Sequence, residues 1–439
     1  MKNTYLKCGD CDYETDLLLE RKFACPECGG LYDVEHRFLN IDAATRRHTF
    51  DRRAVPKTSI MHRSGVWRFG GTTGILMPYI LPEQMISLGE GMHPFVPGGK
   101  ALRKWIGGNL DLYFLLEGIN PTGSFKDNGM TVAVTDASIA GVKALICRST
   151  GDTSAAAAAY AARAGIPCIT LLPRNQGITP SQIVQPLAHN SVVITYPGTF
   201  DDIKDAYNEL VLSGEYYPVN SINPARIEGH TATVYITAQF LGWELPDWFA
   251  VPVGNGSNST SVGIGMRRLL ETGLAQKPAR ILGVQAHSAS PLYDAWVGSR
   301  NNKEWLAKYV SLTGVGNTAA TAQNIGNPAS HKKVIREIGG FRETEGCSGA
   351  MEKAEEGDLR AGMFVAGADG IEVCPQTGVV IAGVRNAVRK GIIKNGQRVV
   401  IVSTAHLLKF VHVVEEERGS MIREINDCRA ESVVRAAGL

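Results

Sequence analysis

The chain has 439 residues, of which 44% are hydrophobic and 20% are charged, and its formal net charge is +2 at pH 7. This balance gives no indication that a nucleic-acid polyanion is an obligatory partner, and the apolar runs stay short of the roughly 20 residues that a membrane span needs. At roughly 100–200 residues a domain, we expect two or three domains in a cytoplasmic protein with neither nucleic acid nor membrane as its partner.

Four of the nine cysteines lie near the N-terminus, as two Cys-x-x-Cys pairs: Cys8 with Cys11, and Cys25 with Cys28. This spacing can close a tetrahedral thiolate shell around zinc, whereas a redox motif needs only one such pair. Four thiolates leave no open position, so the zinc would be structural. The other five cysteines are scattered singly, which favours a reducing compartment over a disulfide framework.

A single lysine, Lys126, stands in a turn of small residues, 120–130, directly after the apolar run 112–116. A helical pattern begins at about Met130, so the lysine lies between a buried strand and a helix, where open α/β sheets collect ligands. A desolvated lysine there loses its preference for the charged form, and its neutral amine can form a Schiff base. The alternative is an ordinary surface lysine in a loop.

Strand and helix patterns alternate regularly after this turn. Buried strands are expected over residues 142–147, 167–173 and 192–196, and helices over residues 155–164, 182–187 and 201–212. This order is typical of a βαβ unit with a parallel sheet. Further helices are expected over residues 228–241, 303–309 and 350–360.

Three polar loops could bind anions. Residues 149–154 precede a poly-alanine helix, residues 220–226 bring an arginine among Ser and Asn, and residues 254–259 form a glycine turn between a strand and a helix. Backbone N–H groups at such helix starts suit a phosphate, although the first loop could also be a simple helix cap. Thr404 adds a hydroxyl at the end of a late strand.

A buried lysine, a phosphate cup, a strand-end hydroxyl and a second anion loop together require an aldehyde that carries a phosphate and lies beside an amino-acid site. Pyridoxal 5'-phosphate meets this description, with Lys126 on the aldehyde, the glycine loop on the phosphate and Thr404 facing the ring nitrogen. A neutral hydroxyl keeps that nitrogen unprotonated, which favours elimination and replacement over transamination.

The same segments resemble threonine synthases, in the plant-like branch of the fold type II pyridoxal-phosphate enzymes. The resemblance covers about residues 65–412, and the N-terminal cysteines resemble the zinc ribbon of some prokaryotic members. The matching segments are 120–127, 149–156, 220–224, Arg226, Gly254–Asn255 with Asn258, 325–328, 374–378 and 403–406.

The resemblance implies a two-domain α/β fold like that of the tryptophan synthase β chain, with parallel-rich twisted sheets flanked by helices and a small zinc ribbon. The implied boundaries are 1–36 for the ribbon, 37–130 and 221–439 for the large domain, and 131–220 for the small α/β domain. A homodimer is also implied, since this class is commonly dimeric.

For the site, the resemblance implies that Lys126 is the Schiff-base lysine and general base. Asp152 would lie beside the phenolic oxygen of the cofactor, and Thr404 would meet its ring nitrogen. Gly254, Asn255, Gly256, Ser257 and Asn258 would hold the cofactor phosphate. The substrate would be held by Ser149 and Thr150 at its α-carboxylate and by Thr153, Ser221, Arg226 and Asn258 at its phosphate.

The implied activity is that of a carbon–oxygen lyase that converts O-phosphohomoserine and water to L-threonine and phosphate. Three places depart from the family pattern: Met92-His93, Asn128, and Leu407, whose side chain would reach toward the active-site loop. Two alternatives therefore stay open. One is a related enzyme for another phosphorylated amino acid, similar to cysteate synthase, and the other is a non-catalytic protein whose zinc ribbon binds a partner.

Overall fold

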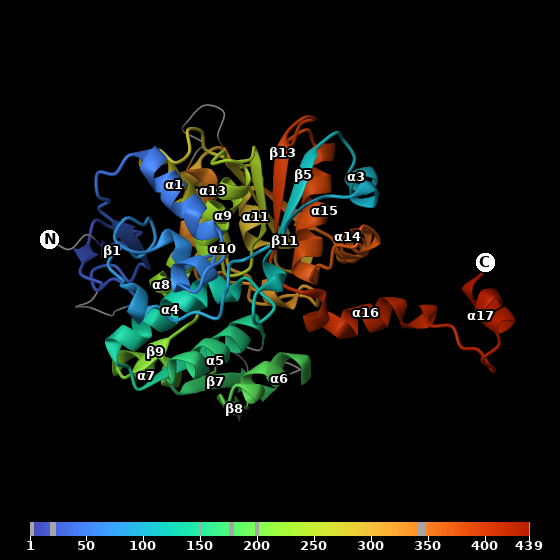
Figure 1. The fold of residues 1–439 in the computed structure, drawn as a ribbon, viewed down its shortest axis with the longest axis horizontal. Helices are drawn as coiled ribbons and strands as arrows, with labels where there is room; N and C mark the ends of the chain where they lie inside the picture. Colours follow the sequence, from blue (N-terminus) through green and yellow to red (C-terminus); the bar gives the residue numbers. More distant parts are fainter. Residues whose placement is uncertain are drawn as a thin grey trace.

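The structure, a computed structural model, describes residues 4–17, 23–149, 151–174, 180–197, 202–340 and 348–438. Over these residues the strands form a small antiparallel sheet, a large mainly parallel sheet and a second, smaller parallel sheet (Figure 1). The predicted α/β class is therefore confirmed, with its parallel sheets and its small N-terminal sheet.

The large sheet has the strand order β12-β11-β10-β13-β5-β4. All neighbours in it are parallel except β4, which pairs antiparallel with β5. Its strands are β4 (Phe95–Pro97), β5 (Asp111–Leu116), β10 (Trp248–Pro252), β11 (Arg280–Ala286), β12 (Ala350–Ala354) and β13 (Arg398–Ser403). Because both faces of a mainly parallel sheet are covered, its central strands read as continuous apolar runs rather than alternating ones.

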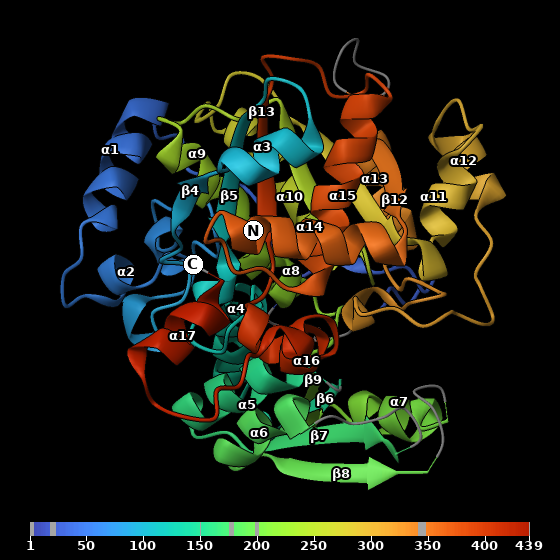
Figure 2. The same cartoon turned by 90° about the vertical axis from the view of Figure 1, so that its right-hand side faces the viewer.

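Alternate residues of β10 belong to two different cores. Trp248 and Ala250 pack with α3, α14 and α15 on one face of the sheet, and Phe249 and Val251 pack with α10 and α13 on the other (Figure 2). This is the alternation that a pleated strand imposes. The helices of the large domain are α1 (Ala43–Ala54), α2 (Ile60–Arg63), α3 (Lys100–Ile106), α8 (Pro224–His230), α9 (Ala232–Phe240), α10 (Ser257–Glu271), α11 (Pro291–Trp296), α12 (Asn302–Lys308), α13 (His331–Gly339), α14 (Glu356–Ala368) and α15 (Pro375–Arg389).

The second sheet confirms the predicted parallel unit. Its order is β8-β7-β6-β9, and every pair is parallel. It lies apart from the large sheet, below it in Figures 1 and 2, and α4 joins the two parts by packing on both α5 and α8. Its elements are α4 (Lys126–Ala140), β6 (Ala144–Arg148), α5 (Asp152–Ala164), β7 (Cys168–Pro173), α6 (Pro180–Ala188), β8 (Val192–Tyr196), α7 (Lys204–Leu212) and β9 (Tyr216–Pro218).

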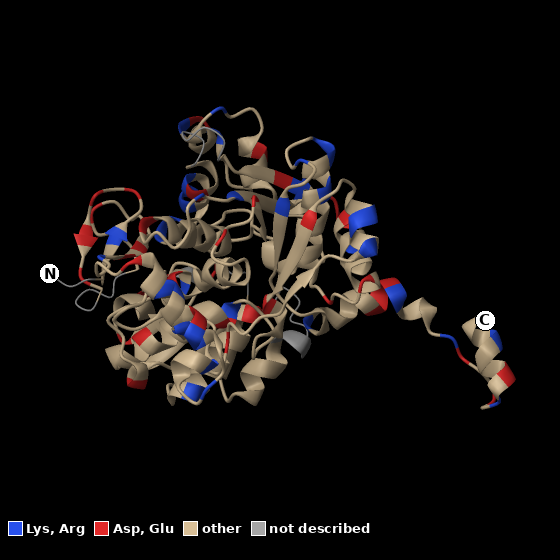
Figure 3. Ribbon diagram, turned by 45° about the horizontal axis from the view of Figure 1, so that its top comes forward, with Lys and Arg blue, Asp and Glu red and all other residues tan. Residues whose placement is uncertain are grey.

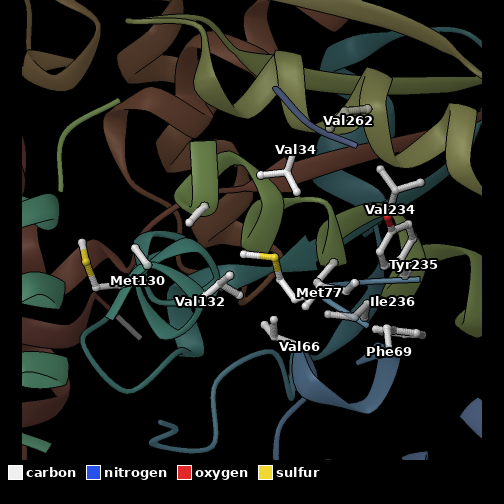
Figure 4. Packing of buried hydrophobic residues seen from close by; sticks show 14 of the residues in the cluster. Val34, Val66, Phe69, Met77, Met130, Val132, Val234, Tyr235, Ile236 and Val262 are labelled. Atoms are coloured by element: carbon white, nitrogen blue, oxygen red, sulfur yellow. The ribbon is translucent and has the colours of Figure 1, made fainter. Parts of the chain in front are cut away.

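The N-terminal sheet is docked on the large domain. It consists of β1 (Thr4–Cys8), β2 (Glu14–Thr15) and β3 (Tyr32–His36), in the order β2-β1-β3. Figure 4 shows Val34 of β3 among buried residues of the large domain, including Val234 of α9 and Val262 of α10. The four-cysteine segment therefore shares the main hydrophobic core.

Two helix predictions are wrong in part. The helix expected over residues 350–360 is a strand, β12, followed by α14, because residues 350–354 pair in parallel with β11 and this tertiary pairing outweighs their helical propensity. The helix expected over residues 228–241 is broken at Thr231, whose hydroxyl donates to the Glu228 carbonyl, 2.6 Å away, between α8 and α9.

The C-terminal helices α16 (Val411–Arg418) and α17 (Ala430–Ala437) extend away from the body in Figure 1. Acidic and basic residues are interspersed over the ribbon in Figure 3. Within the described residues, no helix has the length and apolar character to cross a membrane.

Candidate active site

Three of the predicted loops follow strands that are neighbours in the large sheet. β5 leads toward Lys126, β13 ends directly before Thr404, and β10 leads to Gly254. In the order β10-β13-β5 these strands are parallel, so their carboxyl ends share one edge. That edge is where open α/β sheets bind ligands.

Backbone pairing fixes the lysine loop against the end of β13. The Phe125 N–H donates to the Thr404 carbonyl, 2.8 Å away, and Ser124 forms an antiparallel bridge with Ala405. Helix α4 begins at Lys126, whose Nζ lies 3.7 Å from the centroid of the Phe125 ring. The predicted strand–turn–helix setting of the lysine is confirmed.

The electrostatic setting of Lys126 favours a neutral amine. Burial, assisted by the positive charge of Arg226, lowers its pKa to about 7, while the negative charge of Asp152 opposes the shift. A substantial fraction of the amine is therefore unprotonated near neutral pH. That is the form that attacks an aldehyde or accepts a proton.

The glycine loop closely approaches its neighbours. A Cβ at Gly254 would lie 2.5 Å from the Ala322 carbonyl oxygen, and one at Gly256, where φ is +92°, would lie 2.4 Å from Val334. The Asn255 side chain accepts a 3.3 Å bond from the Ala329 N–H. Only glycine fits at 254 and 256, and the loop leads into the N-terminus of the 15-residue helix α10, where backbone N–H groups attract anions.

Ser257 and Asn258 lie in the first turn of α10 and are both buried. The side-chain oxygen and nitrogen of Asn258 have no hydrogen-bond partner among the described residues. Buried amides are normally satisfied, so this one is available for a ligand.

The loop after β6 opens helix α5. Asp152 is the first residue of α5, and Thr153 follows it, 8% exposed. The Ser149 hydroxyl accepts a 3.3 Å bond from the Gly151 N–H. Thr150, a predicted substrate residue, lies outside the described residues.

Arg226 is the second buried group with free donors. The side chain of Asn223 caps α8 by accepting from the Arg226 N–H at 3.1 Å, and Arg226 Nη1 donates to the Val219 carbonyl at 2.7 Å. Its Nε and Nη2 have no partner among the described residues, although the residue is 1% exposed. Ser221 lies half-buried in the same loop. Burial lowers the pKa of Arg226 to about 10, so it remains a cation at neutral pH.

Thr404 is 3% exposed, and its N–H donates to the Thr377 hydroxyl at 3.2 Å. Its own hydroxyl lies 3.6 Å from the Cys374 sulfur. Gln376, which lies between Cys374 and Thr377 in the sequence, is buried. Neither the oxygen nor the nitrogen of its side-chain amide has a partner in the described part of the chain. The sequence reasoning assigned no role to Gln376, although the segment 374–378 was among the matching motifs.

Two of the departures from the family pattern meet in one buried network. The Asn120 side chain donates to the side-chain oxygen Oδ1 of Asn128 at 3.1 Å, and its own Oδ1 is 3.0 Å from His93 Nε2. The Asn128 side chain in turn donates to the Glu117 carboxylate at 3.0 Å. Burial raises the pKa of Glu117 to about 8 and lowers that of His93 to about 4. At neutral pH both side chains are therefore uncharged.

The other two departures, Met92 and Leu407, lie outside this hydrogen-bond network. The Met92 side chain is 40% exposed, and its sulfur lies 2.6 Å from Arg68 Nη2. Leu407 packs against the apolar cluster that contains Phe410 and Ala405.

The four N-terminal cysteines form a separate site. All four sulfur atoms, of Cys8, Cys11, Cys25 and Cys28, lie within 4.8 Å of one another, and the residues are free thiols rather than disulfides. This donor set could hold a metal ion, as the spacing predicted.

The residues of the α/β site fit pyridoxal phosphate. They offer an amine with a lowered pKa, a glycine cradle at a helix N-terminus, and a hydroxyl at the end of β13. In the described part of the chain, donors on Arg226 and Asn258 have no partner and could bind a second anion. Of the predicted site residues only Thr150 cannot be located.

Residues 86–405 match the family described as "Pyridoxal-phosphate dependent enzyme". The chain is 33% identical over 407 residues to the threonine synthase of Methanocaldococcus jannaschii, covering 92% of each chain. It is also 33% identical to the chloroplastic threonine synthase 2 of Arabidopsis thaliana, covering 91% of this chain and 75% of that protein. Maize serine racemase shares the fold, with a TM-score of 0.60 and 15% identity over 75% of this chain and 92% of the racemase. The chain therefore belongs to the fold type II pyridoxal-phosphate dependent enzymes and is homologous to threonine synthases.

Proposed function

We propose that the protein is a threonine synthase: it converts O-phosphohomoserine and water to L-threonine and inorganic phosphate. The single observation that supports this substrate most is the pair of buried anion-binding side chains, Arg226 and Asn258, whose donors have no partner among the described residues. A cofactor needs one phosphate site, and the glycine loop of α10 already offers it. The second set of donors calls for a substrate with its own phosphate.

Pyridoxal phosphate, when bound, supplies an electron sink for negative charge at the α-carbon of an amino acid. In our proposal Lys126 would hold the cofactor through its amine, and the free amine would move protons at the α-, β- and γ-carbons of the substrate. A pKa of about 7 suits this work, because the amine can both accept and return a proton near neutral pH.

Other residues orient the reactants. Arg226, Asn258, Thr153 and Ser221 would bind the leaving phosphate, while Ser149 and Thr150 would bind the α-carboxylate. The guanidinium, buried and still charged, can give the phosphate two parallel hydrogen bonds. Loss of phosphate from the γ-carbon and addition of water at the β-carbon then complete a balanced reaction.

At the cofactor, Asp152 would lie beside the phenolic oxygen. Gly254, Asn255, Gly256 and Ser257 would share the cofactor phosphate with Asn258, and Thr404 would meet the ring nitrogen. We also propose a structural zinc ion on the four cysteines and a homodimer as the working form.

The test is a phosphate-release assay on the wild type and on Arg226→Ala. The variant removes a charge-assisted contact of roughly 1.5–3 kcal/mol, so kcat/KM for O-phosphohomoserine should fall by roughly ten- to a few-hundred-fold. The absorbance of the bound cofactor should be retained. Arg163→Ala, which changes an exposed arginine near the end of α5, is the matched control and should leave kcat/KM unchanged.

Equal turnover of unphosphorylated homoserine would contradict the second anion site. Phosphate release from O-phosphoserine alone would favour the cysteate-synthase-like alternative. Met92, His93, Asn128 and Leu407 would then be the first residues to exchange.

A further inference from the structure

Lys409 has an unusually complete set of partners. Its Nζ donates to the Thr122 carbonyl at 2.8 Å and to the Gln185 side-chain oxygen at 2.6 Å, and it lies 3.2 Å from the Asp152 carboxylate. An ammonium group has three N–H donors, so each is matched by one acceptor. The Lys409 and Asp152 side chains are only 14% and 13% exposed.

The three acceptors come from separate elements. Thr122 belongs to the lysine loop, Asp152 is the first residue of α5, and Gln185 lies on α6, while Lys409 belongs to a short 3-10 helix, Leu407–Phe410, that follows β13. Gln185 also donates to the Thr122 carbonyl, at 3.1 Å. Lys409 therefore ties two helices of the small domain, α5 and α6, to the lysine loop and to the segment after β13, both of which belong to the large domain.

The local backbone places Lys409 in this position. A Cβ at Gly123, where φ is +81°, would lie 3.2 Å from Lys409 Cδ, so the lysine stem passes over a residue that must be small. The His406 N–H donates to the Gly123 carbonyl at 3.0 Å, beside the bridge between Ser124 and Ala405. The lysine loop and the segment of Lys409 are thus paired as a unit.

We propose that Lys409 is a positioning residue that holds the small domain against the lysine loop and fixes the Asp152 carboxylate through an ion pair. The inference about catalysis rests on the proposed roles of Asp152 and Lys126, whereas the contact between the domains does not.

The ion pair has an electrostatic consequence for Lys126. The charge of Asp152 favours the protonated form of Lys126, and the ammonium of Lys409 partly neutralises that charge. Without Lys409, the pKa of Lys126 should rise. Arg226 and His230 of α8, Glu117 before the lysine loop and Cys147 of β6 also interact electrostatically with Lys126.

Lys409→Met keeps much of the stem and removes the charge. Hydrogen exchange on the holoenzyme should then show about tenfold faster exchange in α6, because this helix loses its tie to the large domain. In the cofactor-stripped full-length chain, acylation of Lys126, followed over pH by mass spectrometry, should shift its midpoint upward by roughly one pH unit. Neither measurement depends on the identity of the substrate, so they test this inference even if the proposed reaction is wrong.

Gln185→Leu separates the two effects. It removes the tie to α6 but leaves the ion pair between Lys409 and Asp152, so exchange in α6 should speed up while the Lys126 midpoint stays unchanged. Lys143→Met, which removes an exposed lysine paired with Glu215, is the control and should change neither quantity. Lys409→Arg should restore the Lys126 midpoint. Unchanged α6 exchange or an unchanged Lys126 midpoint in Lys409→Met overturns the inference.

Discussion

Asp33 joins the four-cysteine segment to the large domain, and its replacement should destabilise the fold. Its carboxylate accepts from Lys333 Nζ at 2.7 Å and from Arg336 Nη2 at 2.6 Å, both on α13. The side chains of Asp33 and Lys333 are each 4% exposed. Asp33→Asn keeps the shape of this side chain and removes its charge, which leaves the lysine buried without its counter-ion.

The size of the effect follows from the burial. Burial alone would raise the pKa of Asp33, but Lys333 and Arg336 outweigh it and hold the pKa well below its usual range, so the native pair is ionised. Removing one partner of a buried pair costs roughly 3–5 kcal/mol. Burial also lowers the pKa of Lys333, which can lose its proton once the aspartate is gone. We therefore expect a cost of about 3 kcal/mol, at the lower end of that range.

Urea unfolding followed by tryptophan fluorescence and circular dichroism measures this cost at pH 7. At pH 9 the penalty of Asp33→Asn should be smaller, because Lys333 deprotonates more readily. Because folding lowers the pKa of Asp33, its contribution is present above about pH 4 and is lost as the pH falls. The Asp33→Asn, Lys333→Met double variant should recover at least about 1 kcal/mol.

Lys332→Met is the control, since the exposed pair of Lys332 with Asp10 should contribute less than about 1 kcal/mol. If Asp33→Asn unfolds at the same urea concentration as the wild type, the reasoning about the buried pair is refuted.

Three further predictions concern other sites. The pKa of Glu117 is about 8 in the fold against an ordinary 4.5, so its contribution to stability is lost as the pH rises between these values. The melting temperature of Glu117→Gln relative to the wild type should therefore rise with pH. Parallel plots of melting temperature against pH for the two proteins would contradict this. Gly129→Ala places a Cβ 2.6 Å from the His230 ring where α4 packs on α8, and it should destabilise the protein by about 1–3 kcal/mol. The control Gly357→Ala places its Cβ in open space and should not destabilise the protein. Equal stability of the two variants would show that the contact between α4 and α8 accommodates a methyl group. Elemental analysis should find one zinc per chain, and chelation should lower the melting temperature while the bound cofactor keeps its absorbance; loss of turnover without loss of stability would contradict a structural metal.

The sequence was most informative where local pattern and chemistry coincide. The turn around Lys126, the glycine loop at 254–258 and the cysteine pairs each combine a fixed spacing with a fixed chemical need, and the structure has them at strand ends or in one cluster. The βαβ unit was predictable because its strands are short apolar runs between helical patterns.

Contacts between segments far apart in the chain could not be predicted in this way. The sequence of residues 350–354 has a helical pattern, and it forms a strand because it pairs with β11. The break at Thr231 coincides with a hydrogen bond from the Thr231 hydroxyl to the Glu228 carbonyl in the preceding turn. Helix α1 was missed because its charged sequence shows no clear apolar stripe. Nor could the sequence show that His93 and Asn128 meet Glu117 in one buried network.

The position of β13 bears on how the chain folds during synthesis. Among the described strands of the large sheet, β13 alone lies between β5 and β10, yet it is formed by residues 398–403, which are nearly 300 residues beyond β5 in the chain. When the ribosome has made the first 390 residues, β5 has no parallel partner on that side and the lysine loop has no segment 404–406 to pair with. The strands of the small sheet lie within residues 144–218 and can pair much earlier. Since closing such distant contacts is slow, the sheet and the site stay incomplete until residues 398–406 have been synthesised, and a truncated chain that ends before β13 would expose the edge of β5 to aggregation.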